Sequence, residues 1–224
     1  MAVKTLLVCG DSFFYDDPRR FPGLHWSHRL PTHIQVQNVA ATGASNTMIM
    51  EQFIDHFRHH DSVIFGFTGP WRLEFANTWS TDLSNLRGKW LTSCHDFRLT
   101  DRQKQFSEQY QQLISPDAEI VRQCSIMFAA VEMARALGAQ VHYSLSGGQW
   151  LVQALCEDYP INNRYAKRFL EDSMPFNLSD YLSSDEYRPY FHLDGTENHP
   201  SFHVHLPEIQ QRFADQVCEL VDKV

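Results

Sequence analysis

Three short segments of the chain carry hydroxyl and glycine residues of the kind that acyl transfer uses, and a histidine lies late in the sequence. Gly10-Asp11-Ser12 holds a serine, Gly43 stands in a polar turn, and Thr68 supplies a second hydroxyl. His199 can act as a base, because an imidazole takes the proton of an attacking hydroxyl while backbone N–H groups and a further hydroxyl stabilise the oxyanion. These residue types indicate a serine hydrolase, provided that the fold brings them together.

The residues that precede these segments have the pattern of buried strands and amphipathic helices. Short apolar runs predict four strands, at Lys4–Cys9, Ile34–Val39, Val63–Phe67 and Gln140–Leu145. Helical spacing of apolar residues predicts helices that begin near Ser45 or Asn46, at Ser115-Pro116, at Gln149 and at Pro207, with Gly138 ending the second. Strands that alternate with helices indicate an α/β fold with a central parallel sheet and helices on both faces.

The position of the candidate residues relative to these strands is informative. Ser12 follows the first predicted strand, Gly43 the second and Thr68 the third. In open parallel sheets, ligands bind at the carboxyl ends of the strands. We therefore expect one site at this edge of the sheet, with His199 brought to it by the segment before the last helix.

Length and composition indicate one globular domain that spans residues 1–224. The 224 residues are 43% hydrophobic and 21% charged, and the formal charge of −8 argues against a nucleic-acid partner. No apolar run is long enough to cross a membrane, and the N-terminus lacks the pattern of a signal peptide. The five cysteines form no CxxC pair. These features favour a cytoplasmic protein with no membrane partner.

Two segments depart from the alternating pattern, near residues 74–104 and 158–193. The first is polar and contains Trp79 and Trp90, and the second is rich in tyrosine, phenylalanine and proline. Long excursions of this kind are often lids over a binding site. We expect them to cover the carboxyl edge of the sheet or, if they pack elsewhere, to form an interface.

The ordered set of motifs resembles the SGNH, or GDSL-type, hydrolases. The resemblance rests on Gly10-Asp11-Ser12, on the Asn-x-x-x-x-Gly turn that ends at Gly43, on a Gly-x-Thr ending at Thr68, and on His199-Pro-Ser. It implies a three-layer, flavodoxin-like fold and hydrolysis of esters without a cofactor. It also implies that Ser12 is the nucleophile, that His199 is the base, and that the N–H groups of Ser12 and Gly43 form an oxyanion hole with the Thr68 side chain.

The chain departs from the family pattern at several positions. Thr68 replaces the usual asparagine, and a hydroxyl can donate one hydrogen bond in its place. The family acid normally stands three residues before the histidine, where this chain has Thr196. Asp194 or Glu197 would then orient His199, with a Ser-His dyad as the third alternative. A glycine usual in the second motif is replaced by Ala40.

The remaining candidates concern substrate and partners. Asn46 and Arg72 are candidate substrate-binding residues, although Arg72 could instead pair with Glu74 on the surface. Similarity to SGNH-like proteins of phage genomes allows a virion-associated location. The expected substrate is a small or carbohydrate-linked ester, and the oligomeric state stays open.

Two alternatives to a hydrolase stay open at this point. The chain could be a catalytically silent SGNH-like module that binds a glycan or a protein partner, or a phosphate binder that uses Gly147-Gly148. His199, His203 and His205 have a spacing that a metal could use, but no cysteine stands beside them and carboxylates lie only upstream, so we expect no metal site.

Overall fold

The structure of the protein is a computed structural model that describes residues 3–16, 18, 22–69, 72–76, 90–92, 99–145, 149–158, 163–175, 178 and 206–223. Its centre is a sheet of four parallel strands, in the order β2-β1-β3-β6. The strands are β1 (Lys4–Gly10), β2 (Ile34–Asn38), β3 (Ser62–Gly66) and β6 (Gln140–Ser144). The predicted parallel sheet is confirmed, and the strand order reverses between β1 and β3, the position where such sheets bind ligands.

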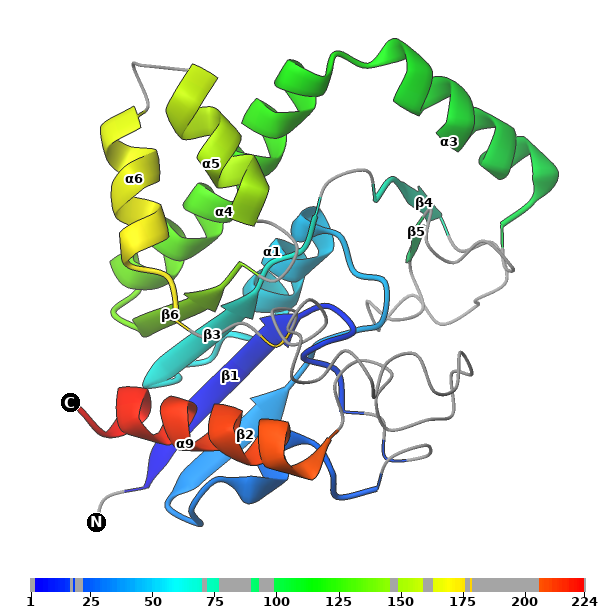
Figure 1. Cartoon of the computed structure of the whole chain (residues 1–224). Helices are drawn as coiled ribbons and strands as arrows, with labels where there is room; N and C mark the ends of the chain where they lie inside the picture. The colour runs from blue at the N-terminus through cyan, green and yellow to red at the C-terminus, as the bar shows by residue number, and fades with distance from the viewer. Residues whose placement is uncertain are drawn as a thin grey trace.

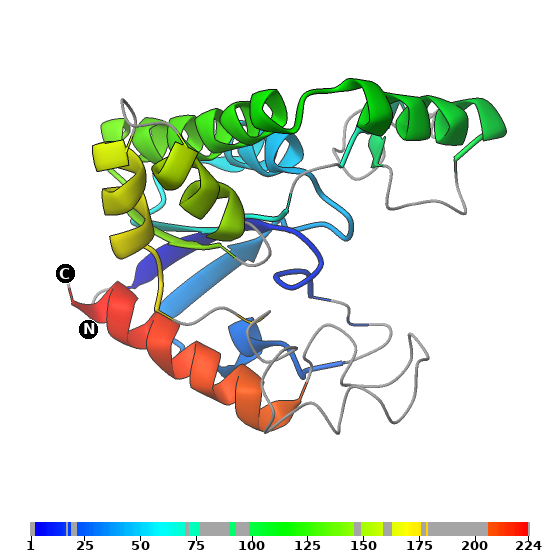
Figure 2. The same cartoon turned by 45° about the horizontal axis from the view of Figure 1, so that its top comes forward.

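Helices cover both faces of this sheet, so the predicted three-layer α/β arrangement is also confirmed (Figure 2). One face carries α1 (Asn46–His56), α4 (Pro116–Ala136), α5 (Gln149–Asp158) and α6 (Asn163–Glu171). The other face carries α9 (Pro207–Asp222) and the 3-10 turn η1 (Trp26–Arg29).

Both faces of the sheet are buried, which explains why the strand sequences are continuous apolar runs. Along β1, Leu7 and Cys9 pack in the core under α1 and α4, whereas Leu6 and Val8 pack in the core under α9. All four side chains are fully buried. Successive strand residues point to opposite faces, so both faces must be apolar when both are covered.

The helices begin where the sequence predicted. The Ser45 hydroxyl caps α1 by accepting a hydrogen bond from the Met48 N–H at 3.2 Å, so Ser45 rather than Asn46 is the cap. Ser115 caps α4, and Pro116 occupies its first turn. After α4 the backbone of Gly138 adopts a φ of +86°, which glycine tolerates and which ends the helix.

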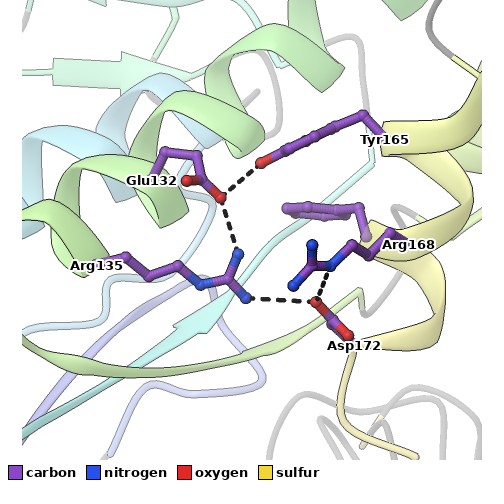
Figure 3. Close-up of a pocket in the computed structure, with 6 residues that line it drawn as sticks. Glu132, Arg135, Tyr165, Arg168 and Asp172 are labelled. Carbon is purple, nitrogen blue, oxygen red and sulfur yellow. Dashed lines mark hydrogen bonds and ion pairs between the residues drawn. The ribbon is translucent and has the colours of Figure 1, made fainter.

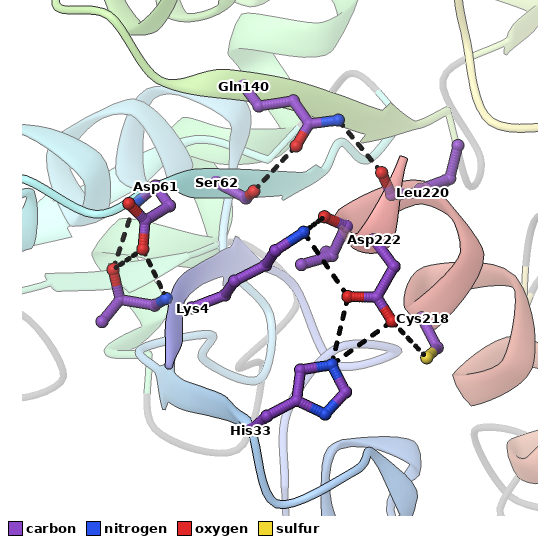
Figure 4. A network of polar contacts seen from close by, with 10 residues as sticks. Lys4, His33, Asp61, Ser62, Gln140, Cys218, Leu220 and Asp222 are labelled. Atoms are coloured by element: carbon purple, nitrogen blue, oxygen red, sulfur yellow. Dashed lines mark hydrogen bonds and ion pairs between the residues drawn. The ribbon is translucent and has the colours of Figure 1, made fainter. Parts of the chain in front are cut away.

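Polar contacts fix α9 to the amino edge of the sheet (Figure 4). The Lys4 ammonium donates to the Val221 carbonyl at 2.7 Å and pairs with Asp222 at 3.5 Å. The His33 ring lies 3.1 Å from the same carboxylate, and this hydrogen bond lowers the pKa of Asp222. On the other side, the Gln140 amide donates to the Leu220 carbonyl at 3.0 Å. The amino edge is therefore closed by structural contacts.

Further elements lie beyond the carboxyl ends of the strands. The antiparallel pair β4 (Glu74–Ala76) and β5 (Trp90–Thr92) is followed by α3 (Asp101–Leu113), which extends away from the sheet (Figure 1). These elements fall mostly within the first predicted excursion.

The second excursion, predicted near residues 158–193, is partly a helix of the main layer. Its residues 163–171 form α6, and the Phe169 ring lies 4.6 Å from the ring of Phe128 and 4.3 Å from that of Tyr143. Ala166, Phe169 and Leu170 recur at helical spacing and pack on this core. This part of the segment therefore does not extend over the carboxyl edge.

Among the described residues, no helix has both the length and the apolar composition needed to cross a membrane.

Candidate active site

Ser12, Gly43 and Thr68 lie at the carboxyl edge of the sheet. Ser12 and Thr68 each stand two residues beyond a strand, and the register of β1 and β3 pairs Gly10 with Gly66, so both hydroxyl residues leave the sheet at the same level. The Gly43 turn lies on the other side of β1, because the Ala41 N–H donates to the Gly10 carbonyl at 3.0 Å. Ser12 therefore leaves a strand that is flanked by the two other candidate loops.

The turn that carries Ser12 is held by its own hydrogen bonds. The Phe14 N–H donates to the Asp11 carbonyl at 3.1 Å, and the Phe13 N–H donates to the Asp11 carboxylate at 3.0 Å. The Asn38 amide of β2 donates to the Phe14 carbonyl at 2.8 Å. Only 7% of Ser12 is exposed. The conformation of the turn is therefore set by Asp11 and Asn38, on either side of the serine.

Two glycines allow this turn to fold back over the strand ends. A Cβ atom at Gly66 would lie 2.1 Å from Cδ2 of Phe14, and one at Gly10 would lie 2.7 Å from its Cβ. Neither approach is possible for atoms that are not bonded. Glycine is required at both positions because the Phe14 ring lies directly on them.

Gln52 of α1 fixes the last residue of β1. Its carbonyl accepts from the Gly10 N–H at 2.8 Å, and its amide donates to the Gly10 carbonyl at 3.2 Å. The side chain is buried, so this bidentate contact is shielded from water. Gln52 thus holds the backbone two residues before Ser12.

Asn46 fixes the backbone of Thr68 by a similar pair of hydrogen bonds. Its side-chain carbonyl accepts from the Thr68 N–H at 2.9 Å, and its amide donates to the Thr68 carbonyl at 3.0 Å and to Gln123 at 2.8 Å. The sequence placed Asn46 among the substrate-binding residues. In the structure it is fully buried, and its donors and acceptor contact the protein.

The Gly43 turn needs a glycine for a different reason. The Ala44 N–H donates to the Ala41 carbonyl at 3.2 Å, and Gly43 has a φ of +70°. This left-handed conformation is unfavourable for residues with a Cβ. The turn presents backbone beside the Ser12 loop, which is the placement that an oxyanion donor needs.

An ion pair between the buried Asp11 and the half-buried Arg72 connects the Ser12 loop to the Gly43 turn. Arg72 lies 3.4 Å from the Asp11 carboxylate and donates to the Ala44 carbonyl at 2.7 Å. Burial raises the pKa of Asp11, while Arg72, the Phe13 N–H and the Thr68 hydroxyl oppose this shift. Arg72, predicted to bind substrate or to pair with Glu74, therefore contacts two loops of the site, and the side chain of Glu74 is not among those described.

Several predicted residues lie outside the described part of the chain. They are the proposed base and its candidate acids, the possible metal-binding histidines, the glycine pair and one tryptophan: His199, Asp194, Glu197, His203, His205, Gly147, Gly148 and Trp79. Within the described residues, no group of three His, Cys, Asp or Glu side chains could hold a metal ion.

A hollow of about 260 Å³ lies between α4 and α6 (Figure 3). Glu132 accepts from the Tyr165 hydroxyl at 2.7 Å and from Arg135 at 2.8 Å. Asp172 pairs with Arg135 at 3.6 Å and with Arg168 at 3.5 Å. Burial and the bond to Glu132 raise the pKa of Tyr165 to about 12, so its hydroxyl stays protonated at neutral pH. These opposite charges pair with one another and attach α6 to α4.

Comparison with known proteins supports the fold. No family model matches the chain, and no curated protein matches it in sequence. Among solved structures, the chain is similar to one from Desulfitobacterium hafniense DCB-2, described as a "putative lipolytic protein of G-D-S-L family". The TM-score is 0.52 at 14% sequence identity, and the match covers 97% of this chain and 99% of that chain. Over nearly its whole length, the chain therefore shares the fold of that G-D-S-L protein.

Proposed function

We infer that the protein is a serine hydrolase of the SGNH type that cleaves ester bonds. The observation that carries this proposal is the position of Ser12 and Thr68, which follow neighbouring parallel strands at the same level, beside the Gly43 turn. The likeness to a G-D-S-L protein is consistent with it. A hydroxyl nucleophile next to donors on both sides is the arrangement that acyl transfer requires.

The proposed reaction begins with attack of the Ser12 hydroxyl on the ester carbonyl carbon, while His199 takes the hydroxyl proton. The N–H groups of Ser12 and Gly43 stabilise the oxyanion, and the Thr68 hydroxyl turns from the Asp11 carboxylate to donate to it. Collapse of this intermediate breaks the bond to the alcohol, which leaves with the proton from His199. Water, activated by the same histidine, then attacks the acyl group on Ser12 and releases the acid.

The role of His199 comes from the resemblance of the late His-Pro-Ser motif to that of the family. A carboxylate would hold the second ring nitrogen and stabilise the imidazolium. Asp194, next to a glycine that allows a sharp bend, is favoured over Glu197 for this role, and a Ser-His dyad is the remaining alternative. The proposed substrate is a small or carbohydrate-linked ester.

Hydrolysis of a short-chain nitrophenyl ester tests the proposal. Ser12→Ala should lower turnover by at least about 10³-fold, because the covalent route is lost. Ser107→Ala is the matched control, since Ser107 of α3 has the same 7% exposure and lies in another part of the chain. We expect the control to keep wild-type turnover.

Two outcomes would contradict the proposal. Turnover that survives in Ser12→Ala would assign the activity to another residue or to a contaminant. A wild-type protein that hydrolyses no ester would favour the non-catalytic alternative, a module that binds a glycan or a protein partner.

A further inference from the structure

A chain of buried polar side chains runs from Thr68 into the layer between α1 and α4. Asn46 holds the N–H and the carbonyl of Thr68 and donates to the Gln123 carbonyl at 2.8 Å. Gln123 in turn donates to Glu119 at 2.8 Å. Each of these four residues is at most 2% exposed. The candidate oxyanion residue is thus connected to Glu119 of α4 through two intervening side chains, Asn46 and Gln123.

The far end of this chain is a carboxylate with several donors. Arg122 donates to Glu119 twice, at 2.9 and 2.6 Å, and the Tyr110 hydroxyl of α3 donates at 3.4 Å. Burial raises the pKa of Glu119, but the hydrogen bonds from Arg122 and Gln123 outweigh it and the pKa is lowered. Glu119 is therefore ionised at neutral pH and can only accept hydrogen bonds.

This charge sets the direction of the two hydrogen bonds that Gln123 forms. Because Glu119 only accepts, Gln123 must turn its amide nitrogen toward it and its carbonyl toward Asn46. Asn46 must then present its nitrogen to Gln123, and its carbonyl faces the Thr68 N–H. A reversed Asn46 amide would place two donors against each other at Thr68. The orientation of Asn46 is therefore fixed from both ends, by the backbone of Thr68 and, through Gln123, by the Glu119 carboxylate.

Packing alone does not require these polar groups. The surrounding layer is apolar, with Ile49, Phe53, Cys124 and Met127 in the same core. Buried amides are costly unless fully hydrogen-bonded, and apolar side chains of similar size would fill the same space. What the amides provide is a fixed backbone at Thr68, two residues beyond the end of β3, where no strand pairing holds it.

We propose that Asn46 and Gln123 are positioning residues, which hold Thr68 so that its hydroxyl lies at the oxyanion position beside Ser12. This proposal rests on the hydrolase function proposed above. The hydrogen bonds of Gln123 go to Asn46 and Glu119. The proposal predicts that a change at Gln123 nevertheless alters the backbone of Thr68 and the rate of the chemical step.

Gln123→Met tests this coupling, because methionine keeps the length of the side chain and removes both hydrogen bonds. We expect hydrogen exchange of the Thr68 N–H to become about tenfold faster and kcat for a nitrophenyl ester to fall about tenfold, with KM within about threefold. Met127→Ala, one turn further along α4 in the same core, is the control for loss of stability. In this variant both the Thr68 exchange rate and kcat should stay near wild type after correction for global stability.

A second variant keeps the test decisive if Gln123→Met does not fold. Glu119→Gln preserves shape but removes the charge that orients the chain, and it should give a smaller increase in Thr68 exchange in the same direction. Unchanged exchange at Thr68 in the folded variants would overturn the proposal. An inactive wild type would instead contradict the hydrolase function, and the exchange rates would then still show whether Gln123 holds Thr68.

Discussion

At the scale of single residues, the backbone and the hydroxyl of Thr68 form contacts with different residues of the candidate site. Its backbone is held by Asn46, so the hydroxyl is not needed to keep the loop in place. The hydroxyl faces the Asp11 carboxylate, where its contact opposes the rise in the pKa of Asp11. Substitution of the hydroxyl therefore leaves the Asn46 contacts in place and removes both the contact with Asp11 and the proposed oxyanion donor.

Thr68→Val removes the hydroxyl and keeps both the shape of the side chain and the backbone contacts with Asn46. Loss of one oxyanion donor costs about 2.7–4 kcal/mol of transition-state stabilisation, so we expect kcat to fall roughly 10²–10³-fold with a folded protein. Steady-state kinetics on a nitrophenyl ester, together with circular dichroism, measure both quantities.

Thr5→Val is the matched control for this substitution. Thr5 uses its hydroxyl to bind Asp61 at 2.8 Å near the amino edge of the sheet, away from the candidate site. It should affect stability and leave kcat near wild type. Equal kcat values for wild type and Thr68→Val would show that Thr68 only packs.

At the scale of elements, the Ser12 turn and the ends of β1 and β3 form one unit. The Phe14 ring lies on Gly10 and Gly66 and contacts Trp26 and Phe213 at ring distances of 6.3 and 5.6 Å. The position of Ser12 therefore depends on packing between the turn, η1 and α9. A change in the sheet beneath Phe14 should shift this ring and, with it, the position of Ser12.

Gly66→Ala tests that dependence. The new Cβ would lie 2.1 Å from Phe14, so the ring and its turn must shift, and overpacking of this kind costs typically about 1–3 kcal/mol. We expect a lower free energy of unfolding in urea and a loss of ester turnover larger than the loss of folded protein.

A double variant separates this clash from a general effect of the new methyl group. Phe14→Leu in the Gly66→Ala background should recover part of the lost stability, because the smaller side chain leaves room for the methyl group. Phe14→Leu alone completes the double-mutant cycle. Additive effects of the two site substitutions would contradict the packing described here.

The strands and most of the helices could be predicted because burial on both faces leaves a strong pattern. Helix α3 left little apolar signal, since Ser107 is its only buried residue, although Thr100 and Gln103 form a capping box that the sequence displays. The segment that contains α6 departs from the alternating pattern and is rich in tyrosine, phenylalanine and proline, so the sequence predicts an excursion there, either a lid or an interface. In the structure, Phe169 and Tyr143 stack in the core.

The candidate site could be predicted only in part, because some of its contacts join residues that are far apart in the sequence. Ser12, Gly43 and Thr68 are found by their position after strands, which is a local property. The bond between Asn46 and Gln123 joins residues 77 positions apart and depends on how α1 packs against α4. The contact of Arg72 with Asp11 is likewise set by the arrangement of two loops. Sequence patterns do not specify such contacts.

At the scale of the whole molecule, the two edges of the sheet differ in what occupies them. The amino edge is closed by Lys4, His33 and Gln140, which hold the end of α9. The carboxyl edge carries the three candidate loops, with Gly10, Gly66, Gln52 and Asn46 directly beneath them. This asymmetry is expected when the sheet serves as a scaffold for one site at its carboxyl end.

The most direct test of the account is the location of a covalent adduct. The wild-type protein is treated with a fluorophosphonate, digested, and analysed by mass spectrometry of the peptides. We predict one adduct per chain, on the peptide that contains Ser12, and none in Ser12→Ala, while Ser107→Ala is labelled as the wild type is. A folded wild-type protein that takes up no probe, or that carries it on another residue, would contradict the claim that Ser12 is an activated nucleophile.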